Sequence, residues 1–295
     1  MAVAPRSQII LTFDGTLAPQ NSVSLRTLSY TIPHFQRAID KTVYFSQLGE
    51  IRKFTSLPAD LHGLADLYID HLEAGSLRIP FISDLLAGVP KLYADFMSQP
   101  YEQSTFETII PSNALAADLE NRKLNVQLDN VETVTQEELI AAEGDRKVAY
   151  AQAAVLKDMS QALSVARTTP GAIISVGVNA DDGFHDFEFD QQRASRFGRI
   201  VGTQRLAEPA MYVGRITGLE RQRASGRFQF AAKFLSRTTG QESKLLVDDY
   251  DDALRIHPHN LSNRDIVIWA SPVSLLGSFD PVRGDIVFVD FADPS

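Results

Sequence analysis

Short β-strand patterns that follow one another over residues 211–291 constrain the fold of this chain most strongly. Each pattern is a run of apolar, β-branched and aromatic residues, and turn-forming residues separate the runs. About five such strands suit a small closed barrel or sandwich. We therefore expect a small β-barrel, OB-like or SH3-like, over residues 206–295. The expected strands cover 212–216, 227–235, 244–247, 265–270 and 285–291.

The chain before the barrel mixes strand and helix patterns. Residues 8–13 form a strand pattern, and Ser24 is a plausible N-cap for a long amphipathic helix that contains Pro33. Two hairpin patterns and several helical patterns follow, one of which starts with the capping box of Thr135 and Glu138. These patterns predict an α+β protein with two domains. The first is a mixed sheet with helices over residues 1–205, and the second is the barrel.

Composition limits the chemistry that the chain can carry. It has 295 residues, 44% of them hydrophobic and 22% charged, which suffices for two ordinary cores. The absence of cysteine excludes disulfides, thiolate catalysis and cysteine-based metal centres. The net charge of −9 disfavours non-specific binding to nucleic acid or anionic membrane. No window approaches the roughly 18 apolar residues of a membrane span. We expect a cytoplasmic protein with no membrane partner and no cofactor.

Residues 11–17 read Leu-Thr-Phe-Asp-Gly-Thr-Leu. This segment resembles the opening motif of haloacid-dehalogenase-type phosphatases, a strand that runs into Asp-x-Asp-Gly-Thr-Leu. The resemblance implies an aspartate nucleophile followed by an aspartate general acid/base. Asp14 matches the second aspartate, but Thr12 stands at the first, and its hydroxyl is a poor substitute for an ionised carboxylate. We interpret the segment as a strand closed by an Asp-Gly turn.

A second candidate site is an acidic hairpin. On a strand, Asp186, Glu188 and Asp190 project from one face, and the two phenylalanines between them project from the other. Three carboxylates on one face could hold a hard divalent cation, which would suit a metal-dependent hydrolase or nuclease. The same alternation is typical of a half-buried strand whose acidic face lies in water. Both interpretations stay open at this point.

A third candidate site is a basic run at the start of the barrel. Arg221, Arg223 and Arg227 flank a loop, and aromatic residues such as Phe228 and Phe230 are interleaved with the basic residues. Basic groups and stackable aromatic rings on a small barrel are typical of modules that bind single-stranded nucleic acid. The alternative is a solvated loop, with Phe228 and Phe230 facing the core. A nucleic-acid-binding protein is therefore one hypothesis for this chain.

Two further clusters have simpler explanations than chemistry. The run 248–252 carries four carboxylates in five residues, which is typical of a solvated surface that balances nearby arginines. His257 and His259 flank Pro258 and could contribute to a metal site with one carboxylate. The proline favours a turn between strands instead.

The strand around Trp269 is apolar on both faces, which predicts burial on both sides. The outer face could be covered by the N-terminal part of the chain or by a partner chain. No nucleophile elbow, phosphate-binding loop, dinucleotide fingerprint or zincin helix is present, which favours a non-enzyme. Our main hypothesis is therefore a non-catalytic interaction or accessory subunit of a larger, bacterial-type assembly. It would act through protein contacts of the barrel, with a protein partner or a homo-oligomer.

Overall fold

The computed structural model describes residues 8–69, 77–82, 88–106, 114–222 and 227–292. Contacts divide the chain into two compact units. The first consists of 1–51, 55–110 and 151–203, and the second of 52–54, 111–150 and 204–295. The second unit thus combines the expected barrel with two earlier segments. The division into sequential domains, 1–205 and 206–295, stays a prediction.

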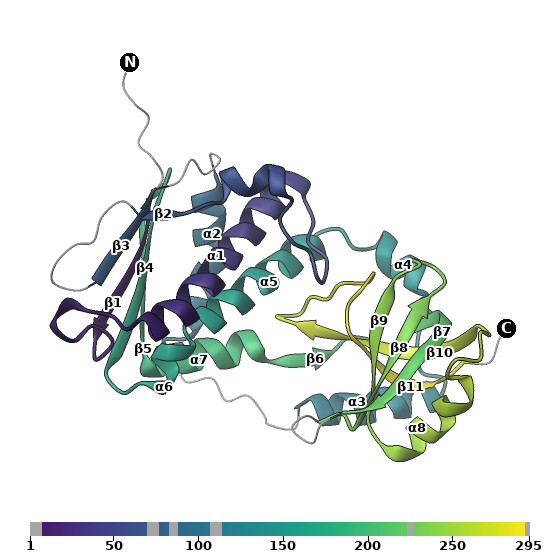
Figure 1. Cartoon of the computed structure of the whole chain (residues 1–295). Helices are drawn as coiled ribbons and strands as arrows, with labels where there is room; N and C mark the ends of the chain where they lie inside the picture. Colours follow the sequence, from purple (N-terminus) through teal and green to yellow (C-terminus); the bar gives the residue numbers. More distant parts are fainter. Residues whose placement is uncertain (1–7, 70–76, 83–87, 107–113, 223–226, 293–295) are drawn as a thin grey trace. The chain divides into compact units, whose positions relative to one another are not determined.

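The first unit is built on an antiparallel sheet covered by helices. Its strand order is β2-β3-β1-β4-β5. Neighbouring strands pair antiparallel throughout the described residues, so the sheet that we expected to be mixed is antiparallel there. Figure 1 shows α1, α2 and α7 on one side of this sheet. The strands are β1 (Gln8–Gly15), β2 (Tyr68–Ile69), β3 (Leu77–Ile82), β4 (Ala172–Ala180) and β5 (Gly183–Asp190). The helices are α1 (Leu25–Leu48), α2 (Val89–Gln103), α5 (Arg146–Ala162, from Ala151 in this unit), α6 (Ser164–Thr168) and α7 (Gln191–Gly202).

Local sequence signals set several of these boundaries. The Ser24 side chain accepts a hydrogen bond from the Thr27 backbone N–H at 3.1 Å, which confirms the predicted N-cap of α1. The helix runs through Pro33 without splitting. It ends at Gly49, whose φ of 72° is left-handed and suits glycine.

The segment that resembles a phosphatase motif is a strand end. Its strand, β1, pairs antiparallel with both β3 and β4. Asp14 accepts hydrogen bonds from the Gly15 N–H through its side chain and from the Leu17 N–H through its carbonyl, which closes a turn. A Cβ at Gly15 would lie 2.1 Å from the Gly171 carbonyl oxygen, so the turn requires glycine. The interpretation as an Asp-Gly turn is confirmed.

The second unit contains a closed five-stranded barrel, which confirms the expected fold class. The order β11-β9-β8-β7-β10 closes through the β10–β11 pairing, and β9 pairs parallel to β11. A helix, α8 (Tyr250–Ile256), connects β9 to β10. This Greek-key arrangement is OB-like. The strands are β7 (Ala210–Arg221), β8 (Phe230–Ser236), β9 (Glu242–Val247), β10 (Ile266–Leu275) and β11 (Ile286–Phe291), and β6 (Gln204–Leu206) adds to the edge of β10.

Besides α8, the helices α3 and α4 pack on the barrel of this unit. The short helix α4 (Gln136–Ala141) begins with the predicted capping box, in which Thr135 and Glu138 bond reciprocally. The other, α3 (Ala114–Gln127), packs on β6 and β11. Figure 1 shows α3 beside β11.

Strands β10 and β11 are buried on both faces, as predicted. Inward-facing Ile268 and Phe288 belong to the barrel core. Outward-facing Val287 and Val289 belong to a second cluster with Leu119 of α3, and Trp269 packs against it. Because α3 covers the outer face, the apolar pattern that suggested a partner chain is satisfied within this chain. Nowhere in the described part does a helix have the length and apolar character to cross a membrane.

Candidate binding site on the barrel

Strands β7, β8 and β9 present one continuous outer face. The register places Lys233 of β8 between Gly218 of β7 and Lys244 of β9. Alternation sends the neighbouring residues Ala232 and Leu245 into the barrel core. The sequence therefore fixes a row of two lysines and one glycine on the outside of the barrel.

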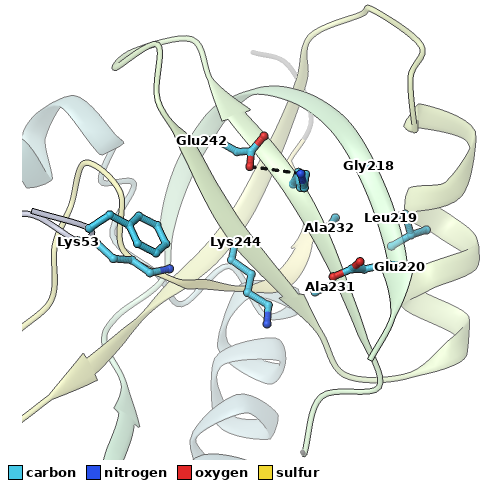
Figure 2. A pocket seen from close by; sticks show the side chains of 10 residues that line it. Lys53, Gly218, Leu219, Glu220, Ala231, Ala232, Glu242 and Lys244 are labelled. Carbon is cyan, nitrogen blue, oxygen red and sulfur yellow. Dashed lines mark ion pairs between the residues drawn. The ribbon is translucent and has the colours of Figure 1, made fainter. Parts of the chain in front are cut away.

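A cavity of about 400 Å³ lies on this face. Figure 2 shows Lys53 and Lys244 extending into the same space, and the dashed line marks the ion pair of Glu242 with Lys233. The cavity is lined by Lys53, Phe54, Gly218, Leu219, Glu220, Ala231, Ala232, Lys233, Glu242 and Lys244. All of these residues belong to the second unit.

Small residues form part of the cavity lining. Gly218 follows a β-bulge, at which the pairing of β7 with β8 shifts between Ile216 and Gly218. A Cβ at Gly218 would meet only the Lys233 side chain, at 3.5 Å or more, which is ordinary contact. Packing therefore does not require glycine there. Gly218 and buried Ala231 together leave open the space that larger side chains would fill.

The lysines on this face are weakly neutralised. Lys233 lies 4.0 Å from the Glu242 carboxylate, at the limit of an ion pair. The Lys244 ammonium donates to the Gln222 side-chain oxygen at 3.1 Å, and no carboxylate pairs with it among the described residues. Lys233 and Lys244 stand directly opposite each other, and like charges in that position destabilise a sheet. An anion bound between them would relieve this repulsion.

A segment from far along the chain supplies one wall of the cavity. The buried Asp280 carboxylate accepts the Lys53 backbone N–H at 2.8 Å and an Arg52 N–H at 3.4 Å. Arg52 also donates to buried Glu143 at 2.8 Å. Lys53 pairs with Asp285 at 2.6 Å. These contacts hold 52–54 on the barrel unit.

The same carboxylate organises the loop in which it lies. Asp280 accepts the backbone N–H groups of Val282 and Arg283 at 2.9 and 3.2 Å. Burial, and to a smaller extent the nearby carboxylates of Asp280 and Asp285, raises the pKa of Tyr150. Its hydroxyl therefore stays neutral beside this cluster of charges.

Of the three arginines of the predicted basic loop, two are described, and neither lines the cavity. Arg221 ends β7 and is exposed, and its side chain makes no hydrogen bond or ion pair with any other described residue. Arg227 pairs with Asp248 at 3.4 Å, and Arg223 lies outside the described residues. Phe228 is buried and Phe230 packs against the barrel core, as the alternative interpretation of the loop expected.

The acidic run after β9 has structural roles. Asp249 caps α8 by accepting the Asp252 backbone N–H at 2.8 Å, so the run starts a helix rather than forming a loop. Asp252 pairs with Lys123 at 2.6 Å. His257 and His259 lie in a single 3-10 turn directly after α8.

The acidic hairpin is built as the plain interpretation expected. Asp186 and Glu188 of β5 are exposed. Asp190 caps α7 by accepting the Arg193 backbone N–H at 2.7 Å. The intervening Phe187 and Phe189 are buried. No group of three metal-ligating side chains able to hold an ion occurs within the described ranges.

Sequence reasoning missed part of the site. It noted Arg221 and the basic run but not Lys53, Phe54, Lys244 or Asp280. The alternation of charged Glu242 and Lys244 on β9 could have indicated an outward face. Nothing local relates Lys53 to the barrel.

Comparisons with protein-family models, with curated proteins and with solved structures find no match for this chain. The class of protein is therefore defined by its own fold and site, an OB-like barrel with a lysine-lined cavity on its outer face.

Proposed function

We propose that this protein is a non-catalytic binding protein whose barrel holds a single-stranded nucleic acid against the β7–β8–β9 face. The observation that carries this proposal is the opposed pair Lys233 and Lys244 on the lining of an open cavity. Two adjacent cations cost stability in the free protein, and a phosphate between them removes that cost. Lysine acts there as a point charge for phosphate.

The shape of the charged surface favours an extended anion. Lys233 and Lys244 line the cavity from adjacent strands, and Lys53 extends into the same space (Figure 2), so three cations surround it. OB-like barrels bind oligonucleotides on this part of the fold. The net charge of −9 repels nucleic acid from the rest of the protein, so binding is confined to this face.

Fluorescence anisotropy with a labelled oligothymidylate of about 12 nucleotides tests the proposal, because OB-like sites take about this length. We expect Lys244→Gln to weaken binding about fivefold to tenfold, a loss of about 1 kcal/mol for one phosphate contact. Lys157→Gln is the matched control, since Lys157 is an exposed lysine of α5 in the other unit. Equal affinities of the two variants would overturn the proposed site.

A protein contact is a second candidate function, in line with an accessory subunit. Tyr250 and Leu254 lie four residues apart on α8 and are 60% and 51% exposed. Native mass spectrometry of protein purified from its host tests this candidate. A bound protein or second copy that Leu254→Glu removes would support it, and a bare monomer would contradict it.

A further inference from the structure

We infer that Phe54 is the platform on which a base of the bound strand stacks. The inference rests on the proposed function, because it assigns the aromatic contact of the same cavity. Phe54 lines the cavity beside the lysines, yet it is 77% exposed. A large apolar ring left in water at the wall of a charged cavity is placed to cover another flat surface.

The backbone of Phe54 supports this inference independently. Its φ is 66°, in the left-handed region that bulky residues rarely adopt. Such conformations persist only where surrounding contacts impose them, and they gather at functional sites. Here buried Asp280 supplies the imposing contacts, because it accepts hydrogen bonds from Arg52 and from the Lys53 backbone. The chain is therefore held in a costly conformation that leaves the ring outside the core.

Lys53 gives the ring a second feature of a stacking site. Its ammonium lies 4.7 Å from the centre of the Phe54 ring and also pairs with Asp285. A cation near the ring and a largely exposed ring surface together provide for one nucleotide, the base on the ring and its phosphate at the ammonium. Phe54 thus determines how a base is held, whereas Lys233 and Lys244 hold the backbone.

The ligand probe is an oligothymidylate that carries one 2-aminopurine, whose fluorescence falls when it stacks. With the full-length protein we expect quenching on binding. Phe54→Ala should lose the quenching and weaken binding about tenfold, within the range measured for base stacking. Its dependence on salt should stay that of the wild type, because no charge is removed.

Controls separate stacking from folding. Phe54→Trp should restore quenching and affinity, whereas Phe54→Leu, apolar but not aromatic, should not. Phe106→Ala is the matched control, since Phe106 is 73% exposed in the other unit. Phe54→Ala should melt like the wild type, because its side chain buries little.

The outcomes of this experiment are distinct. If Phe54→Ala binds and quenches like the wild type while Lys244→Gln is weakened, the stacking inference is wrong and the proposed function stands. If the wild type binds no oligonucleotide at low salt, the proposed function itself is wrong.

Discussion

The acidic face of β5 and the basic face of β8 and β9 are both outward faces of antiparallel strands. On β5, Asp186 and Glu188 are exposed, and Asp190 serves as a helix cap. On the barrel, Lys233 and Lys244 oppose each other and share a cavity with Lys53 and Phe54. On both faces, charged side chains point outward at alternate positions of a strand. The barrel face also has a distant segment, Lys53 and Phe54, fixed beside it, and this segment makes it a candidate site.

Replacing Asp280 should have the largest effect, because this residue holds the distant segment on the barrel. Asp280→Asn removes the charge that holds Arg52 and the Lys53 backbone, and it leaves Arg52 with fewer partners. We expect the free energy of unfolding to fall by about 3 kcal/mol, as when one partner of a buried pair is removed. Urea unfolding measures this change. Asp186→Asn, at an exposed position of β5, is the control. An equal loss of stability in that variant would contradict the role of Asp280.

Filling the cavity should weaken binding without unfolding the barrel. Gly218→Val places a β-branched residue on a strand where a Cβ has room. We expect affinity for the oligonucleotide to fall at least about tenfold, or about 1.4 kcal/mol, with little change in Tm. Gly202→Val in the other unit should bind like the wild type. Undiminished binding by Gly218→Val would show that the ligand lies elsewhere.

On the acidic hairpin, the Asp182 carboxylate should make the free energy of unfolding depend on pH. Hydrogen bonds from His185 and then Lys91 lower the pKa of Asp182 from 3.8 to about 2. Because the folded-state pKa lies below the unfolded one, this stabilisation is present above pH 3.8 and is lost as pH falls towards 2. Unfolding curves of Asp182→Asn and wild type should differ at neutral pH and converge in that window. A constant difference at all pH values would contradict this linkage.

The smallest expected effect concerns divalent cations. We expect Mg²⁺, Mn²⁺ and Ca²⁺ to leave Tm unchanged, because the carboxylates of β5 are separately exposed or used as a cap. Saturating oligonucleotide should raise Tm, since a ligand that binds only the folded state stabilises it. A rise with Mn²⁺ that disappears in Glu188→Gln would support the metal-site hypothesis for this hairpin.

Local patterns were enough to predict much of the fold. The strands of the barrel, the Ser24 cap and the alternation around Phe187 follow from period, capping and turn chemistry. The helix α3 was missed because its pattern is mostly polar and only Leu119 is fully buried. The acidic run was interpreted only as a solvated surface although Asp249 is an ordinary N-cap, a signal that sequence reasoning could have used.

The candidate site was harder to predict because its parts meet only in three dimensions. Asp280 accepts the Lys53 N–H across 227 residues of chain, and no periodicity encodes such a contact. Charge clustering indicated Arg221, which ends β7 and does not line the cavity. Phe54 carried no signal, because its exposure follows from a backbone conformation that other residues impose.

The dependence of oligonucleotide affinity on salt tests the central claim most directly. The measurement is Kd from about 50 to 200 mM NaCl for wild type and for Lys233→Gln/Lys244→Gln. With Lys53, Lys233 and Lys244 at the bound oligonucleotide, log affinity should fall against log salt with a slope of about −2, and the double variant should show about −0.7. Equal slopes and affinities for both proteins would contradict a nucleic-acid site at these lysines.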